Sequence, residues 1–259
     1  MLNEILACSM CHTSLAVTDK DVRVVCARCL SSFRKGAVIW NFMPTQIDLT
    51  APRWQAWQEL QKNGMTSYHA DPEHNLAIGE RVDCQQFAEF CDYRGLVLDV
   101  GCGPQPVPAY FDLNCPATYV GIDPLINDVP THFLKLKALG EFLPFRADVF
   151  DQIIFATTLD HFVDAIAALK EAARVCGPTG VINVWLGEKR ADASKPALSH
   201  EWYRRLHKPT LAEDVFHFKR LDAVAFAELA RIAGLKMIKI EEHHIDDFRT
   251  NWFYRLKAG

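Results

Sequence analysis

The sequence predicts an α/β fold, in which a doubly wound, mostly parallel sheet of seven strands follows a small N-terminal module. Two observations indicate this arrangement. From Gly95 onward, short apolar runs alternate with amphipathic helical segments, and such alternation is typical of a parallel sheet covered by helices on both faces. Near the N-terminus, four of the nine cysteines gather in two closely spaced pairs, which sets that part of the chain apart.

These patterns divide the chain into three parts. We expect short strands and turns over 1–45, a helical linker that covers the cofactor site over 46–94, and the sheet domain over 95–259. The expected strands are 96–100, 119–122, 132–136, 152–156, 181–186, 237–241 and 252–256. The expected helices are 54–61, a segment from Asp71 toward Phe90, 163–175 and 223–233. A turn is expected at 177–180 and a substrate lid insertion at 187–220.

Composition narrows the classes of function. The formal net charge of −4 argues against a chain whose main role is to hold nucleic acid, because such domains are usually strongly basic. No apolar run reaches the roughly 18 residues that suggest a membrane span, and the first residues lack the features of a secretory signal. We therefore expect a cytoplasmic protein without a membrane partner, and reduced thiols rather than disulfides.

The paired cysteines predict a metal site. Cys8 and Cys11 form one CxxC pair and Cys26 and Cys29 another, with fourteen residues between the pairs. Two such pairs can place four thiolates tetrahedrally around Zn²⁺. A redox role is less favoured, because neither pair opens a helix of a thioredoxin-like unit. Four protein ligands leave no open position, so the zinc is expected to be structural.

The cysteine-rich segment from Ile5 to Pro44 resembles the small zinc-ribbon activator proteins that partner tRNA, rRNA and protein methyltransferases. Val38 stands where those proteins usually have a proline, so the match is partial. The resemblance implies a ribbon that docks on a methyltransferase and stabilises it, here within one chain. Residues 1–50 carry five basic and four acidic side chains, and a Zn(Cys)₄ group adds two negative charges. This balance favours packing over binding of a phosphate backbone.

A glycine turn follows the first expected strand of the sheet domain. The strand 96–100 ends in Asp99-Val100 and opens onto Gly101-Cys102-Gly103-Pro104. Glycines let the backbone approach a ligand at the carboxyl ends of parallel strands, where ligands of such sheets bind. The third glycine of the dinucleotide fingerprint is absent. An acid directly before the glycines would repel a pyrophosphate, whereas it suits a ligand that carries an ammonium and a sulfonium.

Five segments in order resemble the motifs of class I methyltransferases that use S-adenosylmethionine (SAM). They are 99–103, 120–123, 140–145, 150–154 and 174–180. The resemblance implies that Asp123 accepts hydrogen bonds from the ribose hydroxyls and that backbone near Leu139 and Gly140 holds the adenine. The cofactor-binding residues it implies are Asp99, Gly101, Cys102, Gly103, Asp123, Pro124, Leu139, Gly140 and Thr157.

The residues after the fourth expected strand of that domain usually face the methyl group in this family. Here they are Thr157 to His161. Methyl transfer depends mainly on alignment and on the exclusion of water, and a base helps when the nucleophile is a hydroxyl. His161 is the candidate base, with a packing role at the helix start as the alternative. Asp160 is expected to cap the following helix. Tyr68 is expected to cover the methionine end of the cofactor, and the pair His243-His244 is a second, weaker candidate for chemistry.

The sequence leaves several classes of substrate open. The segment 187–220 holds eight Lys/Arg against five Asp/Glu, with Trp202 and Tyr203, which suggests a substrate with a phosphate or carboxylate. The leading hypothesis is methylation of a small or medium anionic metabolite on oxygen or nitrogen. The alternatives are an RNA methyltransferase with a zinc module, which the net charge disfavours, and an inactive SAM-binding regulatory protein, which the intact motif residues disfavour.

Overall fold

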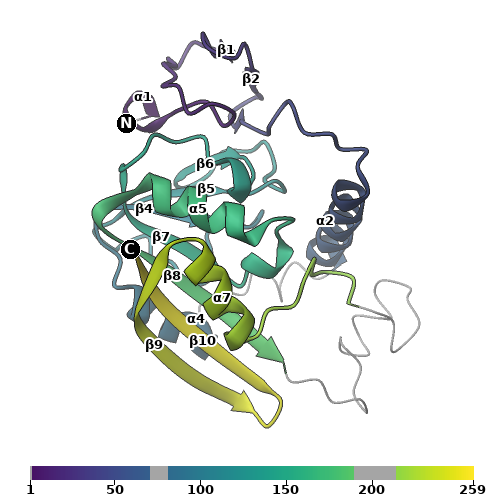
Figure 1. The fold of residues 1–259 in the computed structure, drawn as a ribbon. Helices are drawn as coiled ribbons and strands as arrows, with labels where there is room; N and C mark the ends of the chain where they lie inside the picture. Colours follow the sequence, from purple (N-terminus) through teal and green to yellow (C-terminus); the bar gives the residue numbers. More distant parts are fainter. Residues whose placement is uncertain (1, 71–80, 190–213) are drawn as a thin grey trace.

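In the computed structural model, the structure describes residues 2–70, 81–189 and 214–259. Their strands form one ten-stranded sheet in the order β1-β2-β3-β6-β5-β4-β7-β8-β10-β9 (Figure 1). Seven of these strands make the sheet domain that the sequence predicts: β4 (Leu96–Val100), β5 (Thr118–Ile122), β6 (Leu134–Lys137), β7 (Phe150–Ala156), β8 (Cys176–Lys189), β9 (Leu235–Asp246) and β10 (Arg249–Ala258). β6, β5, β4, β7 and β8 are parallel, and β10 is antiparallel to both of its neighbours. The predicted fold class is confirmed.

The N-terminal module adds three further strands to one edge of that sheet. After α1 (Leu2–Ile5) come β1 (Arg23–Val25), β2 (Ser32–Lys35) and β3 (Trp40–Asn41). β3 pairs in parallel with β6, with Trp40 opposite Leu136. The sheet therefore has ten strands rather than seven, because the cysteine-rich module continues the hydrogen-bonded ladder through β3.

Helices cover both faces of the sheet. α5 (Ala165–Val175) and α7 (Ala223–Ile232) share one apolar core with Leu98 and Val100 of β4. α4 (Val82–Cys91) packs on the opposite face in a core that includes Val97. This division follows from the alternation of side chains along a strand. Asp99 lies on the same face as Val97 and so points toward the α4 side.

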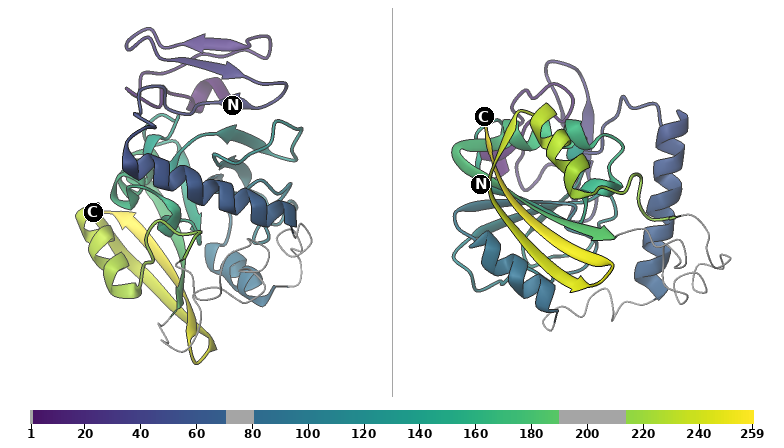
Figure 2. Two further views of the ribbon diagram at one scale, coloured as in Figure 1. Left: turned by 90° about the vertical axis from the view of Figure 1, so that its right-hand side faces the viewer. Right: turned by 60° about the horizontal axis from the view of Figure 1, so that its bottom comes forward.

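The long helix α2 (Pro52–Ala70) runs past the sheet on the side of the carboxyl strand ends (Figure 2). Trp54 and Trp57 are buried against Leu139, and their T-shaped ring pair has centroids 5.6 Å apart. This apolar anchor holds one face of the helix on the domain. The helix places Tyr68 above the strand ends, which positions a wall of the site described below.

Three local expectations differ from the structure. β8 begins at Cys176 rather than at 181, and residues 177–180 bulge from its pairing with β7, because Cys176 lies opposite Phe150 and Val181 opposite Gln152. α5 is capped by Asp164, whose carboxylate accepts from the amide of Ala167 at 2.9 Å, and not by Asp160. In the described part of the chain, the helix that we expect to start at Asp71 begins at Val82. Residues 71–80, and residues 190–213 of the expected lid, lie outside the described residues.

Within the described ranges, none of the helices combines the length and the apolar character that crossing a bilayer requires.

Candidate active site

The turn after β4 forms the floor of the site. Gly101 and Gly103 adopt φ values of +91° and +72°, in the region that residues with a Cβ rarely enter. A Cβ on Gly101 would lie 2.6 Å from the side chain of Thr158. The hydroxyl of Thr158 donates to the carbonyl of Val100 at 2.9 Å, so the turn and the end of β7 are in direct contact. Glycine at position 101 is therefore required by both backbone conformation and space.

A buried lysine holds this turn from below. Lys135 of β6 is 2% exposed, and its Nζ donates to the carbonyls of Gly103 at 3.1 Å and Gln105 at 2.5 Å. The side-chain amide of Gln105 donates to the carbonyl of Cys102 at 2.8 Å. Sequence reasoning missed Lys135. The available signal was a charged residue between Leu134 and Leu136 in a strand expected to be buried.

Asp123 follows β5 and faces the turn. Its Oδ2 accepts from the amide of Gly103 at 2.9 Å, and its Oδ1 accepts from the amide of Leu125 at 2.7 Å. Burial raises the pKa of this carboxyl, while the two amides and the charge of Lys135 oppose that rise. A carboxylate oxygen can accept more than one hydrogen bond. Both oxygens thus keep capacity for hydroxyl groups of a ligand.

Asp99 lies beneath the site rather than in its lining. Its carboxyl is fully buried, and its Oδ2 accepts from the hydroxyls of Tyr110 at 2.8 Å and Tyr119 at 2.5 Å. Its Oδ1 has no hydrogen-bond partner among the described residues. Burial raises the pKa of Asp99 to about 7, although both tyrosines and Lys135 lower it. Of the groups around Asp99, Tyr110 reaches the cavity.

The cavity itself has a volume of about 250 Å³ and lies between the carboxyl strand ends and α2. Seven residues predicted from the sequence line it: Gly101, Gly103, Asp123, Pro124, Leu139, Thr157 and His161. Three predicted cofactor residues, Asp99, Cys102 and Gly140, are absent from the lining. Asp99 and Cys102 are fully buried and Gly140 packs against Val100 and Phe162, so the structure places these three in supporting positions.

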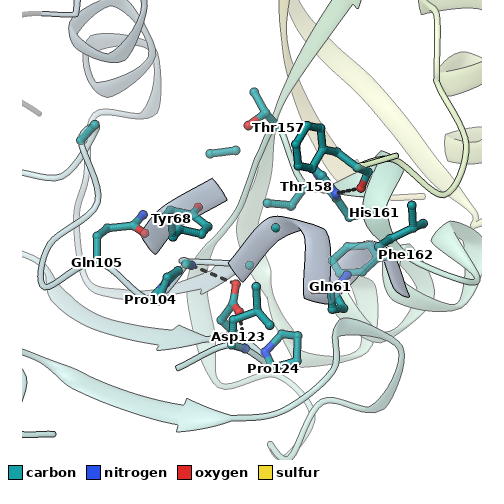
Figure 3. A pocket seen from close by; sticks show the side chains of 18 of the residues that line it. Gln61, Tyr68, Pro104, Gln105, Asp123, Pro124, Thr157, Thr158, His161 and Phe162 are labelled. Carbon is teal, nitrogen blue, oxygen red and sulfur yellow. Dashed lines mark hydrogen bonds between the residues drawn. The ribbon is translucent and has the colours of Figure 1, made fainter. Parts of the chain in front are cut away.

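Helix α2 supplies much of the remaining wall. Its contributions are Trp57, Leu60, Gln61, Gly64 and Tyr68. Burial, with the negative charge of Asp123 nearby, raises the pKa of Tyr68. Tyr68 thus lies on the Asp123 side of the cavity, as Figure 3 shows, with Thr157, Thr158 and His161 on the other side. The bounds 46–94 of the segment that we expect to cover the cofactor site stay a prediction. Tyr68, which belongs to that segment, lines the cavity.

His161 ends the short 3-10 helix η2 (Leu159–His161). Its Nδ1 lies 2.8 Å from the carbonyl oxygen of Phe216 (Figure 3), and its Nε2 lies 3.8 Å from a carboxylate oxygen of Asp160. Burial lowers the pKa of His161, and Asp160 opposes that shift. Burial thus favours the neutral form of the imidazole. The pair His243-His244 lies on β9 and outside the cavity lining.

The four N-terminal cysteines converge as their spacing predicts. Cys8 and Cys29 have sulfurs 3.5 Å apart, and so do Cys11 and Cys26; all four sulfurs lie within 4.8 Å of one another. Tetrahedral zinc with Zn–S bonds of about 2.3 Å spaces its sulfurs by about 3.8 Å. These donors therefore fit Zn²⁺ in a site with four protein ligands.

The two cysteine pairs sit in equivalent turns. The residue after each pair, His12 or Leu30, adopts a φ near +60°, at 58° and 62°. Its amide donates to the carbonyl of the first cysteine of that pair, at 2.9 Å for Cys8 and 3.0 Å for Cys26. Two matching turns that face each other are the local reason why the four sulfurs meet.

Comparison with known proteins assigns the family. A protein-family model described as methyltransferase domain matches residues 78–240. No curated protein matches the chain.

Solved structures share the fold at low identity. The 1,6-didemethyltoxoflavin-N1-methyltransferase of Burkholderia thailandensis, crystallised with 1,6-didemethyltoxoflavin and S-adenosylhomocysteine, matches with a TM-score of 0.56 at 14% identity, over 94% of this chain and 99% of that chain. A SAM-dependent methyltransferase of Leishmania major matches with a TM-score of 0.54 at 14% identity, over 79% and 82%. The [4+2]-cyclase SpnF matches with a TM-score of 0.53 at 17% identity, over 78% and 97%.

These likenesses confirm the fold, and the family model covers more than half of the chain. The chain belongs to the methyltransferase domain family, and it is a SAM-dependent methyltransferase of the class I fold.

Proposed function

We propose that this enzyme methylates a small or medium, anionic metabolite on oxygen or nitrogen. The observation that carries the proposal is the position of α2, which closes the cavity over the strand ends with Trp57, Gln61 and Tyr68. A cavity walled by a helix in this way suits an acceptor that enters whole. It suits a base within a polynucleotide less well, because such a base must be extruded from its strand to enter.

The residues around the cavity fit SAM in a defined orientation. Asp123 would accept from the ribose hydroxyls, and Leu139 would contact the adenine. The carboxyl of Asp99 accepts from the hydroxyl of Tyr110 at 2.8 Å, and Tyr110 lines the cavity, so Asp99 would support the wall beside the methionine portion without touching it. SAM supplies an electrophilic methyl group. The protein's part is to hold the two reactants in line and to exclude water from them.

The acceptor would approach from the side of Thr157 and His161. Arg81 lines the cavity near the ring of Trp185, with its guanidinium carbon 6.0 Å from the ring centroid. Asp83 holds Arg81 with two hydrogen bonds, at 2.6 and 3.1 Å, which fixes the direction of the guanidinium. The indole nitrogen of Trp185 is buried without a partner among the described residues. These two donors support an acceptor that carries a carboxylate or phosphate.

One comparison and the net charge support a small acceptor. The Burkholderia thailandensis enzyme with the same fold is named a 1,6-didemethyltoxoflavin-N1-methyltransferase and was crystallised with 1,6-didemethyltoxoflavin bound. The net charge of this chain, −4, is a weak basis for binding RNA. The RNA methyltransferase hypothesis stays the alternative, and it is one outcome of the test below.

The test uses SAM labelled on its methyl group. The full-length protein is incubated with a desalted small-molecule extract and, separately, with total RNA, and the label is followed in each pool. We expect transfer into the small-molecule pool, retained on an anion exchanger. Transfer into RNA alone would overturn the substrate class. Binding of SAM by calorimetry without transfer into either pool would overturn the proposed activity.

Asp123→Ala tests the cofactor site, and Asp112→Ala is its matched control. Losing two hydrogen bonds from a carboxylate, each worth about 1.5–3 kcal/mol, is expected to weaken SAM binding by about a hundredfold or more. Asp112→Ala, at an exposed loop residue whose carboxylate accepts from nearby Asn114, is expected to bind SAM as the wild type does. Equal affinities in the two variants would contradict the role given to Asp123.

A further inference from the structure

A cluster of three potential metal ligands lies at the His161 end of the cavity. Asp160, His161 and His217 each offer one ligand atom, and these atoms lie within 4.8 Å of one another. The Nε2 atoms of the two histidines lie 3.8 and 3.7 Å from separate carboxylate oxygens of Asp160. These distances exceed hydrogen-bond length, so the three groups face one another without being bonded.

The other nitrogen of each histidine ring is already engaged. Nδ1 of His161 lies 2.8 Å from the carbonyl of Phe216, so it must donate. Nδ1 of His217 lies 2.9 Å from both oxygens of Asp214, so it donates as well. In the neutral form of each ring, a proton on Nδ1 leaves a lone pair on Nε2, and both Nε2 atoms lie beside the Asp160 carboxylate. Metal-binding histidines are oriented in this way, by a carbonyl or carboxylate behind the ring.

Among the described residues, one fixed cation lies at ion-pair distance from Asp160. The Asp160 side chain is 8% exposed. Nη1 of Arg220 lies 3.8 Å from its carboxylate, beyond hydrogen-bond length, while Nε of Arg220 is bonded to Asp214 at 2.7 Å. Burying a carboxylate is costly unless its charge is paired. A cation between the three groups would reduce that cost.

We propose that Asp160, His161 and His217 bind a divalent first-row transition metal ion. Two imidazole nitrogens and one carboxylate oxygen form a donor set that suits such ions. Bonds of about 2.1 Å place donors about 3.0–3.5 Å apart, so donor atoms that lie within 4.8 Å of one another need to approach by no more than about 1–2 Å. Three protein ligands leave coordination positions open, and His161 lines the cavity. If the proposed function holds, a carboxylate, phosphate or hydroxyl of the acceptor would occupy one of them.

The site stands apart from the cysteine cluster, and the test must keep the two separate. Zinc-replete full-length protein is titrated with Mn²⁺, and free Mn²⁺ is followed by its electron paramagnetic resonance signal. Mn²⁺ prefers oxygen and nitrogen ligands to thiolates and is the weakest competitor for a zinc site. We expect one bound Mn²⁺ per chain with a Kd well below about 1 mM.

Variants locate the ion. His217→Ala and Asp160→Asn are each expected to weaken Mn²⁺ binding at least about tenfold, and Asp214→Ala about tenfold through loss of the partner that orients His217. His132→Gln changes an exposed histidine away from the cluster and is expected to leave the affinity unchanged. Wild-type protein that binds no Mn²⁺ in this range, or variants that all bind as the wild type does, would overturn the proposal.

Activity is not needed for this test, so its failure is distinguishable from failure of the proposed function. SAM binding by each variant is measured by calorimetry. Asp123 lies on the other side of the cavity from His161 (Figure 3), so a variant that is folded should still bind SAM. Should Asp160→Asn lose SAM binding as well, His161→Gln provides the second variant. Loss of Mn²⁺ binding in that variant supports the site, and full Mn²⁺ binding contradicts it.

Discussion

Lys135 and Gly103 are 32 residues apart in the chain, and the Nζ of Lys135 donates to the carbonyl of Gly103 at 3.1 Å. The ammonium group comes from β6, two strands away from the end of β4 in the sheet order. It holds the glycine turn in place without touching the cavity. The neighbouring amide of Gly103 donates to Asp123, so one residue of the turn links the buried lysine to the group that we expect to bind ribose.

Lys135→Met tests this link. The substitution keeps an unbranched side chain, shorter by one atom, but leaves two buried carbonyls, of Gly103 and Gln105, without their donor. An unsatisfied buried group costs about 1–3 kcal/mol. We expect the variant to unfold at lower denaturant concentration and to bind S-adenosylhomocysteine at least about tenfold more weakly, measured by calorimetry. Lys170→Met, at an exposed position of α5, should match the wild type in both. Unchanged affinity in Lys135→Met would show that the turn holds its shape unaided.

Asp99 predicts a particular dependence of stability on pH. Burial raises its folded-state pKa to about 7, above the value of about 3.9 expected in the unfolded chain. The folded protein then holds the proton more tightly, so this group's contribution to stability is complete below about pH 4 and is lost as pH rises through about 7. Asp99→Asn does not titrate at this position, and its amide oxygen can still accept from both tyrosines.

We therefore expect the free energy of unfolding of the wild type to fall, relative to that of Asp99→Asn, between about pH 4 and pH 7. Urea unfolding of both proteins across this range measures the difference, and all other titrating groups are common to the two. Parallel profiles would mean that Asp99 is ionised in the folded protein throughout the range.

Removal of the metal from the cysteine cluster should weaken the sheet at its β3 edge. The module that holds β1, β2 and β3 is too small for an independent core, and structural zinc commonly contributes about 10–16 kcal/mol of apparent binding energy. We expect Cys11→Ser to lose one equivalent of zinc by mass spectrometry and to lower the Tm by at least about 5 °C. Cys115→Ser, outside the cluster, should retain both zinc and Tm. Full stability of metal-free Cys11→Ser would refute a structural role.

The sequence predicts those parts of the site whose residues lie close together in the chain. The glycine turn and Asp123 each follow a single strand, and the cysteine pairs form local turns. Lys135, Trp185 and His217 could not be found in this way, because each acts on groups far along the chain and its role depends on how the strands and loops are packed together.

Asp99 shows a second limit of sequence reasoning. Its position at the end of a strand predicts contact with a ligand, but the alternation of β4 turns its side chain toward Tyr110 and Tyr119 on the α4 face. The packing of helices on both faces of the sheet decides which helix each side chain of a parallel strand contacts. The same holds for 177–180, where glycine and proline predict a turn between helix and strand, whereas β8 already pairs with β7 at Cys176 and the four residues bulge from the ladder before Val181.

Asp128 joins the cysteine-rich module to the sheet domain and gives the last prediction. Its carboxylate accepts from three successive amides, those of Ala37 at 2.5 Å, Val38 at 2.9 Å and Ile39 at 2.8 Å, directly before β3. These bonds lower the pKa of Asp128. Their stabilising effect is therefore present above the ordinary carboxyl pKa and is lost as pH falls through the lowered value.

In Asp128→Ala the three amides lose their acceptor, so we expect faster hydrogen exchange at residues 37–39 and a lower Tm at pH 7, with the Tm difference from the wild type shrinking in strong acid. Asp247→Ala, an exposed carboxyl in the β9–β10 connection, is the control and should change neither. Because β3 starts at Trp40, loosening these amides should also speed exchange at the β3–β6 pairing. If exchange rises at 37–39 alone, the ladder itself, and not this carboxylate, holds the module on the sheet.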